Sequence, residues 1–351
     1  MGDIEKRLNK AAIKVGATWG TEVNAGAIGR GILPLNAGAP KGSIQMLEDE
    51  SDSAFDVNLD VGNFMASDFN LDFDYHWDGL ENQLLALLMG VDTAPAVQGG
   101  TAAILHTITL KNSVVGLFAT YAVEKGTKIH ICPSVKVMKL ALSGSGGLLK
   151  ASFGLRADKL IDTSAILASM AAVTVPANAH YRAKFNQTVI RMNDHTWAGG
   201  GVALASPTHV IKPKSFSLEI ERKMDSEHTT GSQAFIEPIE TDKPTVKLTM
   251  DFPRMDAVNE LYFADWIAGT NKKADIVITG PYAEGSNTYH YVLNIQLPRL
   301  IVEDVEYAES KVIPSKIVLR GATSDIAQTG LTGTLPVGIF LTNTIAASLI
   351  L

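Results

Sequence analysis

Two aspartates that could act as a catalytic acid pair, Asp72 and Asp74, alternate with apolar residues in the segment FNLDFDYHW, residues 69–77. In an extended strand, residues two positions apart point to the same face, so these carboxylates would lie about 7 Å apart. Glycosidases place their two carboxylates at a similar separation, but on separate elements that surround a pocket. The sequence indicates no such pocket, and we interpret the pair as part of a solvated strand face.

The segment DVNLDVG, residues 56–62, carries oxygen-bearing side chains at alternate positions, as a calcium-binding loop does. Such a loop requires glycine at its sixth position and glutamate at its twelfth. Val61 and Ser67 occupy these two positions here. The pattern therefore favours a polar strand face over a calcium site.

Two further motifs lack residues that their chemistry requires. In SGSGGLLKAS, residues 143–152, leucine rather than glycine precedes Lys150, so the phosphate cradle of a Walker motif is missing. We interpret this segment as a glycine-rich hairpin turn. His130 and Cys132 share one strand face, but a zinc site needs about four ligands. The sequence therefore predicts no catalytic, cofactor-binding or metal-binding residues, and a protein that is not an enzyme.

The composition of the 351-residue chain narrows its class further. The net charge of -7 argues against a basic groove for nucleic acid, because such a groove binds by neutralising phosphates. A single cysteine excludes an intrachain disulfide framework. The N-terminal residues are too charged for an export signal, and the apolar segment 335–351 is shorter than the roughly 20 residues of a spanning helix. We therefore expect no membrane partner, and a C-terminal segment that docks on a partner or on the chain's own core.

The elements that position these residues follow a plan that occurs twice. After the first alternating strand, the period changes to a helical one at Leu80, with Asp78 as the expected N-cap and Gly90 near the helix end. The segment 246–269 repeats a strand followed by a helix. Each half of the sequence therefore predicts a strand braced by a short helix.

Overlays of the two halves support an internal duplication. Asp74 aligns with Asp251 when the segment 246–269 is laid on the first strand and helix without a gap. A second ungapped overlay places residues 128–157 on 291–321, where apolar positions again coincide. Halves that share the order of strand, helix and further strands are typical of a duplication whose sequence identity has decayed.

We therefore predict a mainly β chain with two tandem domains. The expected divisions are a first domain at residues 1–161, a linker with the first strands of the second copy at 162–215, a second domain at 216–325 and a C-terminal tail at 326–351. The first domain includes a long irregular loop at about 38–65, which contains the acidic run EDESD. Loops of this length in compact domains usually have a function.

Three stretches of the first half resemble the major tail tube proteins of long-tailed, siphovirus-type bacteriophages. They are VGATWGTEVNAGAI (15–28), FNLDFDYHWDGLENQLLALLMG (69–90) and SVKVMKLALSGSGGLLKASFGLRADKLI (134–161). The second half fits as a degenerate copy. The resemblance implies β-sandwich domains, each with a short flanking α-helix. It also implies that subunits join strand to strand, close into a ring with a shared β-barrel, and stack into a hollow tube.

The usual ring of this family contains six copies of one such domain. A chain with two copies needs three subunits to supply six, so we expect a homotrimeric ring with pseudo-sixfold symmetry. An acidic lumen suits DNA that passes without specific binding, because carboxylates repel phosphates. Our candidates for lumen-facing residues are Asp72, Asp74 and Asp251. Our candidates for contacts with the next ring are the N-terminal segment and the loop at 41–66, with the acidic residues Glu48, Asp49, Glu50 and Asp52.

The expected function is that of a structural subunit of the virion tail, synthesised in the bacterial host cytoplasm, which self-assembles and conducts DNA during ejection. Other expected partners are the tape measure, tail terminator and distal tail proteins. The alternative is a β-sandwich binding module, such as a virion decoration or carbohydrate-binding protein, which requires an aromatic patch on one exposed face. The four tryptophans are dispersed along the sequence, which favours the structural role.

Overall fold

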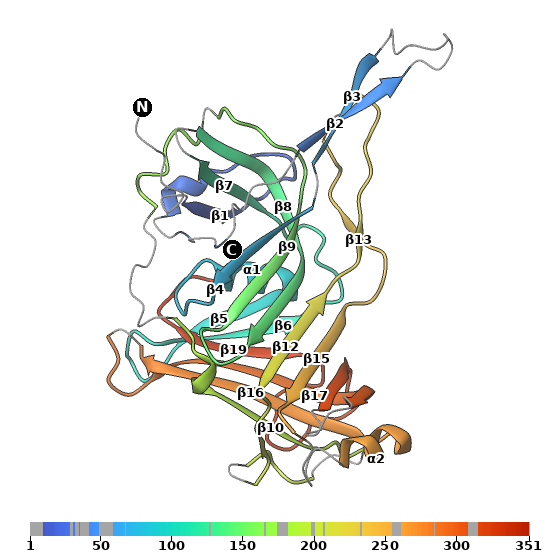
Figure 1. Ribbon diagram of the computed structural model, residues 1–351. Coiled ribbons are helices and arrows are strands. Elements are labelled where there is room, and N and C mark those ends of the chain that lie inside the picture. Colours follow the sequence, from blue (N-terminus) through green and yellow to red (C-terminus); the bar gives the residue numbers. More distant parts are fainter. Residues whose placement is uncertain are drawn as a thin grey trace.

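The chain folds mainly as β-structure, as predicted, with 51% of residues in strands and two α-helices in the described part. Figure 1 shows the computed structural model. The structure describes residues 10–28, 31, 35, 42–48, 59–66, 68–125, 128–164, 166–173, 182–197, 201–205, 208–231, 234–254, 261–283, 285–307 and 315–350.

The strands vary in length from two residues to 17 residues in β8 and 18 in β17 (Figure 1). The helices are α1 (Glu81–Met89) and α2 (Leu261–Ala268). The strands of the first half are β1 (Ala11–Val15), β2 (Gly42–Glu48), β3 (Leu59–Ala66), β4 (Phe69–Asp74), β5 (Gly90–Val97), β6 (Ile104–Leu110), β7 (Ala119–Lys125), β8 (Lys128–Gly144) and β9 (Lys150–Ala157). Those that follow are β10 (Thr188–Asp194), β11 (Val210–Ile211), β12 (Ser215–Glu221), β13 (Met224–Asp225), β14 (Ile239–Glu240), β15 (Thr245–Phe252), β16 (Asn271–Tyr282), β17 (His290–Tyr307), β18 (Ser315–Ala322) and β19 (Gly338–Asn343).

One continuous sheet of fifteen strands runs through both halves of the sequence. Its main path is β1-β7-β8-β12-β15-β18-β17-β16-β10-β11, with β4, β5, β6, β9 and β19 attached beside it. Because β12 pairs with β8 on one side and β15 on the other, the two halves share this sheet. In the described residues the sheet remains open. The shared barrel is expected to close only when several chains assemble, and that closure stays a prediction.

Strands of the two halves nevertheless follow the same spatial order. The order is β1-β7-β8-β9-β4 in the first half and β10-β16-β17-β18-β15 in the second. In each half a helix follows the final strand of this series along the chain, α1 after β4 and α2 after β15. Each half also has a register shift between its third and fourth strands, at Val137/Lys139 and at Val302/Asp304. The division into two tandem domains, with its limits, stays a prediction.

The start of α1 differs from the prediction, because Asp78 does not cap it. The N-cap position is Leu80, which makes no side-chain capping bond. The Asp78 carboxylate instead accepts hydrogen bonds from the Tyr291 hydroxyl at 2.6 Å and the Thr344 backbone N–H at 2.9 Å. The residue expected to cap α1 therefore binds segments that lie far away in the sequence. The predicted end is confirmed, since Gly90 adopts a φ of 96° that suits glycine.

The strand before α1 ends earlier than the alternation predicts, and the residues that follow it are buried. β4 ends at Asp74, and His76, which the alternation places on the polar face, is buried. Its backbone N–H donates to the Glu81 carboxylate at 2.6 Å. The buried ring of Trp77 stacks on Tyr291 of β17, with ring centroids 6.0 Å apart. This contact fixes α1 of the first half against a strand of the second.

The C-terminal segment docks on the chain's own core. β19 pairs with β17 on one side and with β6 on the other, and so joins the two halves a second time. Behind it, the buried His106 imidazole contacts Asp92 at 3.1 Å and the Ile345 carbonyl at 2.8 Å. Asp92 also accepts the Leu349 backbone N–H at 2.8 Å. These bonds hold residues 345–349 against β5 and β6.

Candidate assembly surfaces

The strands that connect the two halves present one continuous polar face. Inward residues such as Leu71, Phe153 and Leu248 are buried, and the residues between them point to the opposite side. Residues opposite each other in an antiparallel pair share a face, so the register carries this face across β4, β9, β8, β12, β15 and β18 to the end of β17. We call this surface the polar sheet face; its polar residues include Asp72, Asp74, Lys139, Ser143, Lys150, Ser152, Ser217, Glu219, Glu221, Thr245, Lys247, Thr249, Asp251, Asp304, Glu306, Lys316 and Arg320.

The three lumen candidates lie on this one face but do not form an acid pair across the halves. Asp74 lies opposite Lys150, and Asp251 lies opposite Lys316. Three strands separate β4 from β15, which places Asp72 and Asp251 more than about 19 Å apart at the usual spacing of strands. Two of the carboxylates accept a hydrogen bond from a serine hydroxyl, Asp72 from Ser152 and Asp251 from Ser215. The three carboxylates therefore lie on a solvated strand face and do not converge on one catalytic site.

Charges of both signs alternate across the polar sheet face, with acidic residues in excess. Ion pairs at half-exposed positions join neighbouring strands, Lys139 with Glu219 at 3.5 Å and Lys316 with Glu306 at 3.1 Å. Lys247 of β15 reaches across β18 to Glu303 of β17 at 3.2 Å. Beyond these ion pairs, the residues of the face named above comprise five carboxylates and two cations. The carboxylates are those of Asp72, Asp74, Glu221, Asp251 and Asp304, and the cations are Lys150 and Arg320.

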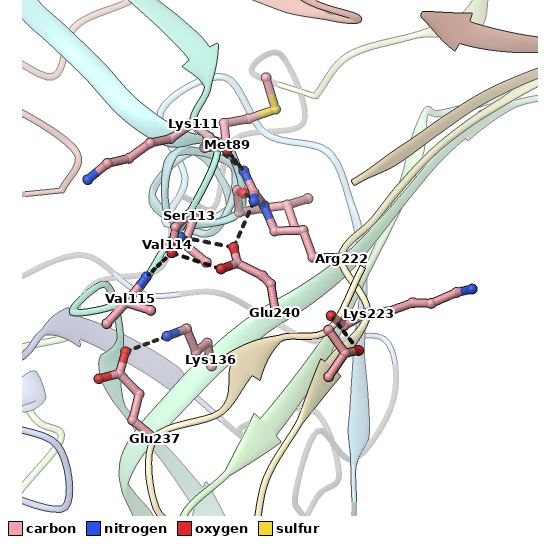
Figure 2. Close-up of polar contacts among 12 residues, drawn as sticks. Met89, Lys111, Ser113, Val114, Val115, Lys136, Arg222, Lys223, Glu237 and Glu240 are labelled. Carbon is pink, nitrogen blue, oxygen red and sulfur yellow. Dashed lines mark hydrogen bonds and ion pairs between the residues drawn. The ribbon is translucent and has the colours of Figure 1, made fainter. Parts of the chain in front are cut away.

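A buried cation on the other side of the sheet joins the second half to α1 (Figure 2). The Arg222 guanidinium donates to the backbone carbonyls of Leu88, Met89 and Lys111 at 2.7, 3.1 and 2.7 Å. Two of these carbonyls belong to the last turn of α1, where a cation is favoured by the helix dipole. The guanidinium also donates to Glu240 at 2.8 Å. Burial lowers the pKa of Arg222, and Glu240 acts in the opposite direction.

Two glutamates from the same segment bind the loop that follows β6 (Figure 2). Glu240 accepts the Ser113 hydroxyl and the Val114 backbone N–H, each at 2.9 Å. Glu237 accepts the Gly116 backbone N–H at 2.6 Å. The loop donors are thus satisfied by carboxylates that arrive from residues more than a hundred positions away.

Lys136 of β8 completes this arrangement. Its side chain is 1% exposed and its ammonium donates to Glu237. Burial lowers the pKa of Lys136, and the Glu237 carboxylate raises it. Two buried cations therefore face two carboxylates at the junction of the halves. We call the four residues the buried ionic cluster: Lys136, Arg222, Glu237 and Glu240.

Sequence reasoning missed the buried ionic cluster, although one signal was present. Phe216, Leu218 and Ile220 alternate toward the core along β12, and Arg222 occupies the next inward position. A cation that continues an apolar alternation must find buried acceptors, because an unpaired buried charge is costly. The identity of those acceptors depends on long-range pairing, which the sequence alone does not reveal.

The stretch predicted as an irregular loop at about 38–65 instead contains the β2–β3 hairpin, which projects from the body of the molecule (Figure 1). The acidic candidates for contacts between rings belong to β2 or to the residues between the two strands, and the N-terminal segment stays a further candidate. Glu48 is the last residue of β2, and its backbone pairs with Leu59. Asp49, Glu50 and Asp52 lie outside the described residues. Met46 on the hairpin is 59% exposed, so at least one of its apolar side chains faces outward.

The described residues contain no group of three or more His, Cys, Asp or Glu side chains that could hold a metal ion. None of the helices in the described part of the chain is long and apolar enough to span a bilayer.

The sequence was compared with known proteins to identify the family of the chain. A search of curated proteins gives no match. The phage tail tube protein family matches residues 8–329, which is nearly the whole chain, and this agrees with the resemblance of the three sequence stretches. The chain therefore belongs to the phage tail tube protein family.

Proposed function

We propose that the protein is a tail tube subunit that assembles into trimeric rings with pseudo-sixfold symmetry. The observation that carries this proposal is the repeated strand order of the two halves, each followed by a helix after β4 or β15. A chain with two similar halves supplies two of the six positions that the family's ring needs. Three chains related by a closed threefold axis then complete the ring.

The junction inside the chain suggests how neighbouring chains join. β12 bridges β8 and β15, so the halves are connected by strand pairing within one sheet. Open sheet edges such as those of β1, β4 and β5 are a liability in a monomer, and closure into a shared barrel removes them. We expect the junction between chains to repeat the junction between the halves.

In this arrangement the polar sheet face lines the channel through which DNA leaves the capsid. It is the face that crosses both halves, and its excess of carboxylates disfavours a lasting grip on phosphates. Asp72, Asp74 and Asp251 then face the lumen. The role is structural rather than catalytic.

Stacking of the rings is assigned to the β2–β3 hairpin, with Glu48, Asp49, Glu50 and Asp52 as the acidic contacts. The hairpin projects from the body, so it can reach a neighbouring ring (Figure 1). The tape measure protein inside the tube, and the tail terminator and distal tail proteins at its ends, are the further partners proposed. The assembled protein is located in the virion tail after synthesis in the bacterial cytoplasm.

The test is negative-stain electron microscopy of the purified protein, together with the mass of isolated rings. We expect annuli or tubes whose averages have threefold symmetry, and a ring mass of three times the 37.5 kDa of the chain. A ring of six chains would contradict the pseudo-sixfold arrangement. A chain that stays monomeric at high concentration would contradict ring formation and favour the binding-module alternative.

A further inference from the structure

Helix α2 presents an exposed apolar face at one end of the molecule (Figure 1). Ile267 is 71% exposed, and Phe263 and Trp266 are each 40% exposed. Residues spaced by three and four positions lie on the same side of a helix, so these three side chains form one stripe, which we call the α2 apolar face. Grouped exposed apolar side chains of this size mark interaction surfaces more often than scattered ones do.

The helix that carries this face is fixed to the sheet, in part through Trp266 itself. Buried Tyr262 packs on Phe252 of β15, with ring centroids 6.2 Å apart. The Trp266 indole N–H donates to the Glu303 carbonyl of β17 at 3.1 Å. Asp265 forms an ion pair with Lys272 at 2.6 Å. The apolar side chains of the stripe are thus exposed although the helix itself is packed on the sheet.

Helix α1 occupies the matching place in the first half, and its surroundings show what covers such a helix. α1 packs on β8 as α2 packs on β17. On its other side α1 contacts β5 and β6, and β6 continues through β19 into β17 of the second half. As a result, Leu84, Leu87 and Leu88 are buried. Leu85 of α1 also lines a small cavity together with Leu293 and Ile295 of β17 and with Ile339 of β19. Strands of the second half and the C-terminal tail therefore contribute to the cover of the first half's helix.

We infer that the α2 apolar face is a contact surface for the first half of a second copy of this chain. The inference rests on the ring proposed above, in which first and second halves alternate. Within one chain, the second half contributes to the cover of α1, through β17 and through Arg222. The first half that follows α2 around the ring belongs to the next chain, so the matching cover of α2 comes from that chain.

A pair of matched variants tests this contact. Ile267→Glu places a charge on the α2 apolar face, and Val202→Glu places the same charge at a side chain that is 64% exposed and lies off this helix. We expect wild-type protein and V202E to form rings, and I267E to remain monomeric with an unchanged thermal unfolding midpoint, as measured by light scattering and circular dichroism. If wild-type protein forms rings and I267E does too, this inference fails alone. If wild-type protein stays monomeric, the ring proposal fails and this inference fails with it.

A cross-linking experiment identifies the occupant without altering assembly. A photoreactive amino acid at position 267 is incorporated into isotopically light chains, which are mixed with heavy chains before ring assembly. We expect cross-links between light and heavy chains that map to peptides within residues 10–161. Rings that yield no cross-links between chains, or cross-links confined to the second half, overturn the inference.

Discussion

At the scale of single residues, the buried ionic cluster brings two cations and two carboxylates together at the junction of the halves. The Arg222 guanidinium donates to four acceptors, and its charge is compensated by Glu240 and by the carbonyl end of α1. Removal of one partner from a buried pair leaves the other without compensation, which costs far more than the loss of an exposed pair. The cluster therefore adds a costly-to-break contact to the strand pairing that joins the two halves.

We predict that Arg222→Met lowers the free energy of unfolding by about 3–5 kcal/mol, because it leaves Glu240 and the α1 carbonyls without their cation. The matched control is Lys223→Met, which removes a neighbouring ion pair with Asp242 whose side chains are more than half exposed. The control should cost less than about 1 kcal/mol. Urea unfolding of both variants measures the difference; equal losses would contradict the assigned role of Arg222.

Glu81 gives the fold a pH dependence. The carboxyl group is 2% exposed, and burial raises its pKa from an ordinary 4.5 to about 7. Burial also raises the pKa of Asp158 to about 6. A carboxyl group with a raised pKa binds its proton more tightly in the folded state, so stability is greatest below the ordinary pKa. Stability then falls as the pH rises through the window up to the folded-state pKa.

We therefore predict that the free energy of unfolding decreases between pH 4.5 and 7, with Glu81 contributing up to about 3 kcal/mol of the change. Glu81→Gln should remove that part and leave the smaller part of Asp158. Glu219→Gln, at a half-exposed position on the polar sheet face, is the control and should keep the wild-type slope. Denaturant unfolding at several pH values is the measurement, and an unchanged slope in E81Q would refute the assignment.

At the scale of elements, the periodic segments could be predicted from the sequence and their partners could not. The change of period after residue 77 gave β4 and α1 to within a few residues, and the alternation at 246–252 gave β15. The glycine-rich turn between β8 and β9 was also correct. Asp78 failed as a helix cap because Tyr291 and Thr344, which lie far away in the sequence, bind it.

The candidate site shows the same division between local and long-range information. Alternation placed Asp72, Asp74 and Asp251 on polar strand faces correctly, since a period of two is a local property. That these faces belong to one sheet depends on β12, whose pairing with both β8 and β15 has no signal in a single sequence. Their role in the lumen stays a prediction.

The β2–β3 hairpin leads to a prediction about stacking. Gly42 and Ala66 lie opposite each other at its base, so a short Gly-Ser turn can replace residues 42–66 without straining the ends. We expect this deletion to leave soluble rings of unchanged symmetry that do not stack into tubes, because the projecting contact is lost. Electron microscopy and sedimentation distinguish the two states. Tubes of normal length would show that stacking uses another surface.

At the scale of the whole molecule, the charge of the polar sheet face should govern how DNA behaves inside the tube. We predict that tubes carrying Asp72→Lys, Asp74→Lys and Asp251→Lys retain DNA at low salt and release it as the salt concentration rises, because the new cations neutralise phosphates. Wild-type tubes should show no such retention. The measurement is co-sedimentation of short DNA duplexes with tubes across a salt series.

The control for this prediction carries the same change of charge away from the polar sheet face. Asp225, Glu227 and Asp242 are exposed near β13 and β14. Lysine at these three positions should retain less DNA than lysine at the three lumen candidates. Equal retention by the two sets of tubes would mean that the outer surface, and not the lumen, binds the duplex.

The pairing of β19 with β6 also sets the order in which the molecule can be completed during synthesis. His106 and the Ile345 carbonyl that it contacts are 239 positions apart. A ribosome must therefore translate almost the entire second half before β6 acquires its partner on that side. Such long-range pairing slows folding and leaves a strand edge exposed in the nascent chain. The fold thus couples the protection of that edge to the synthesis of β19.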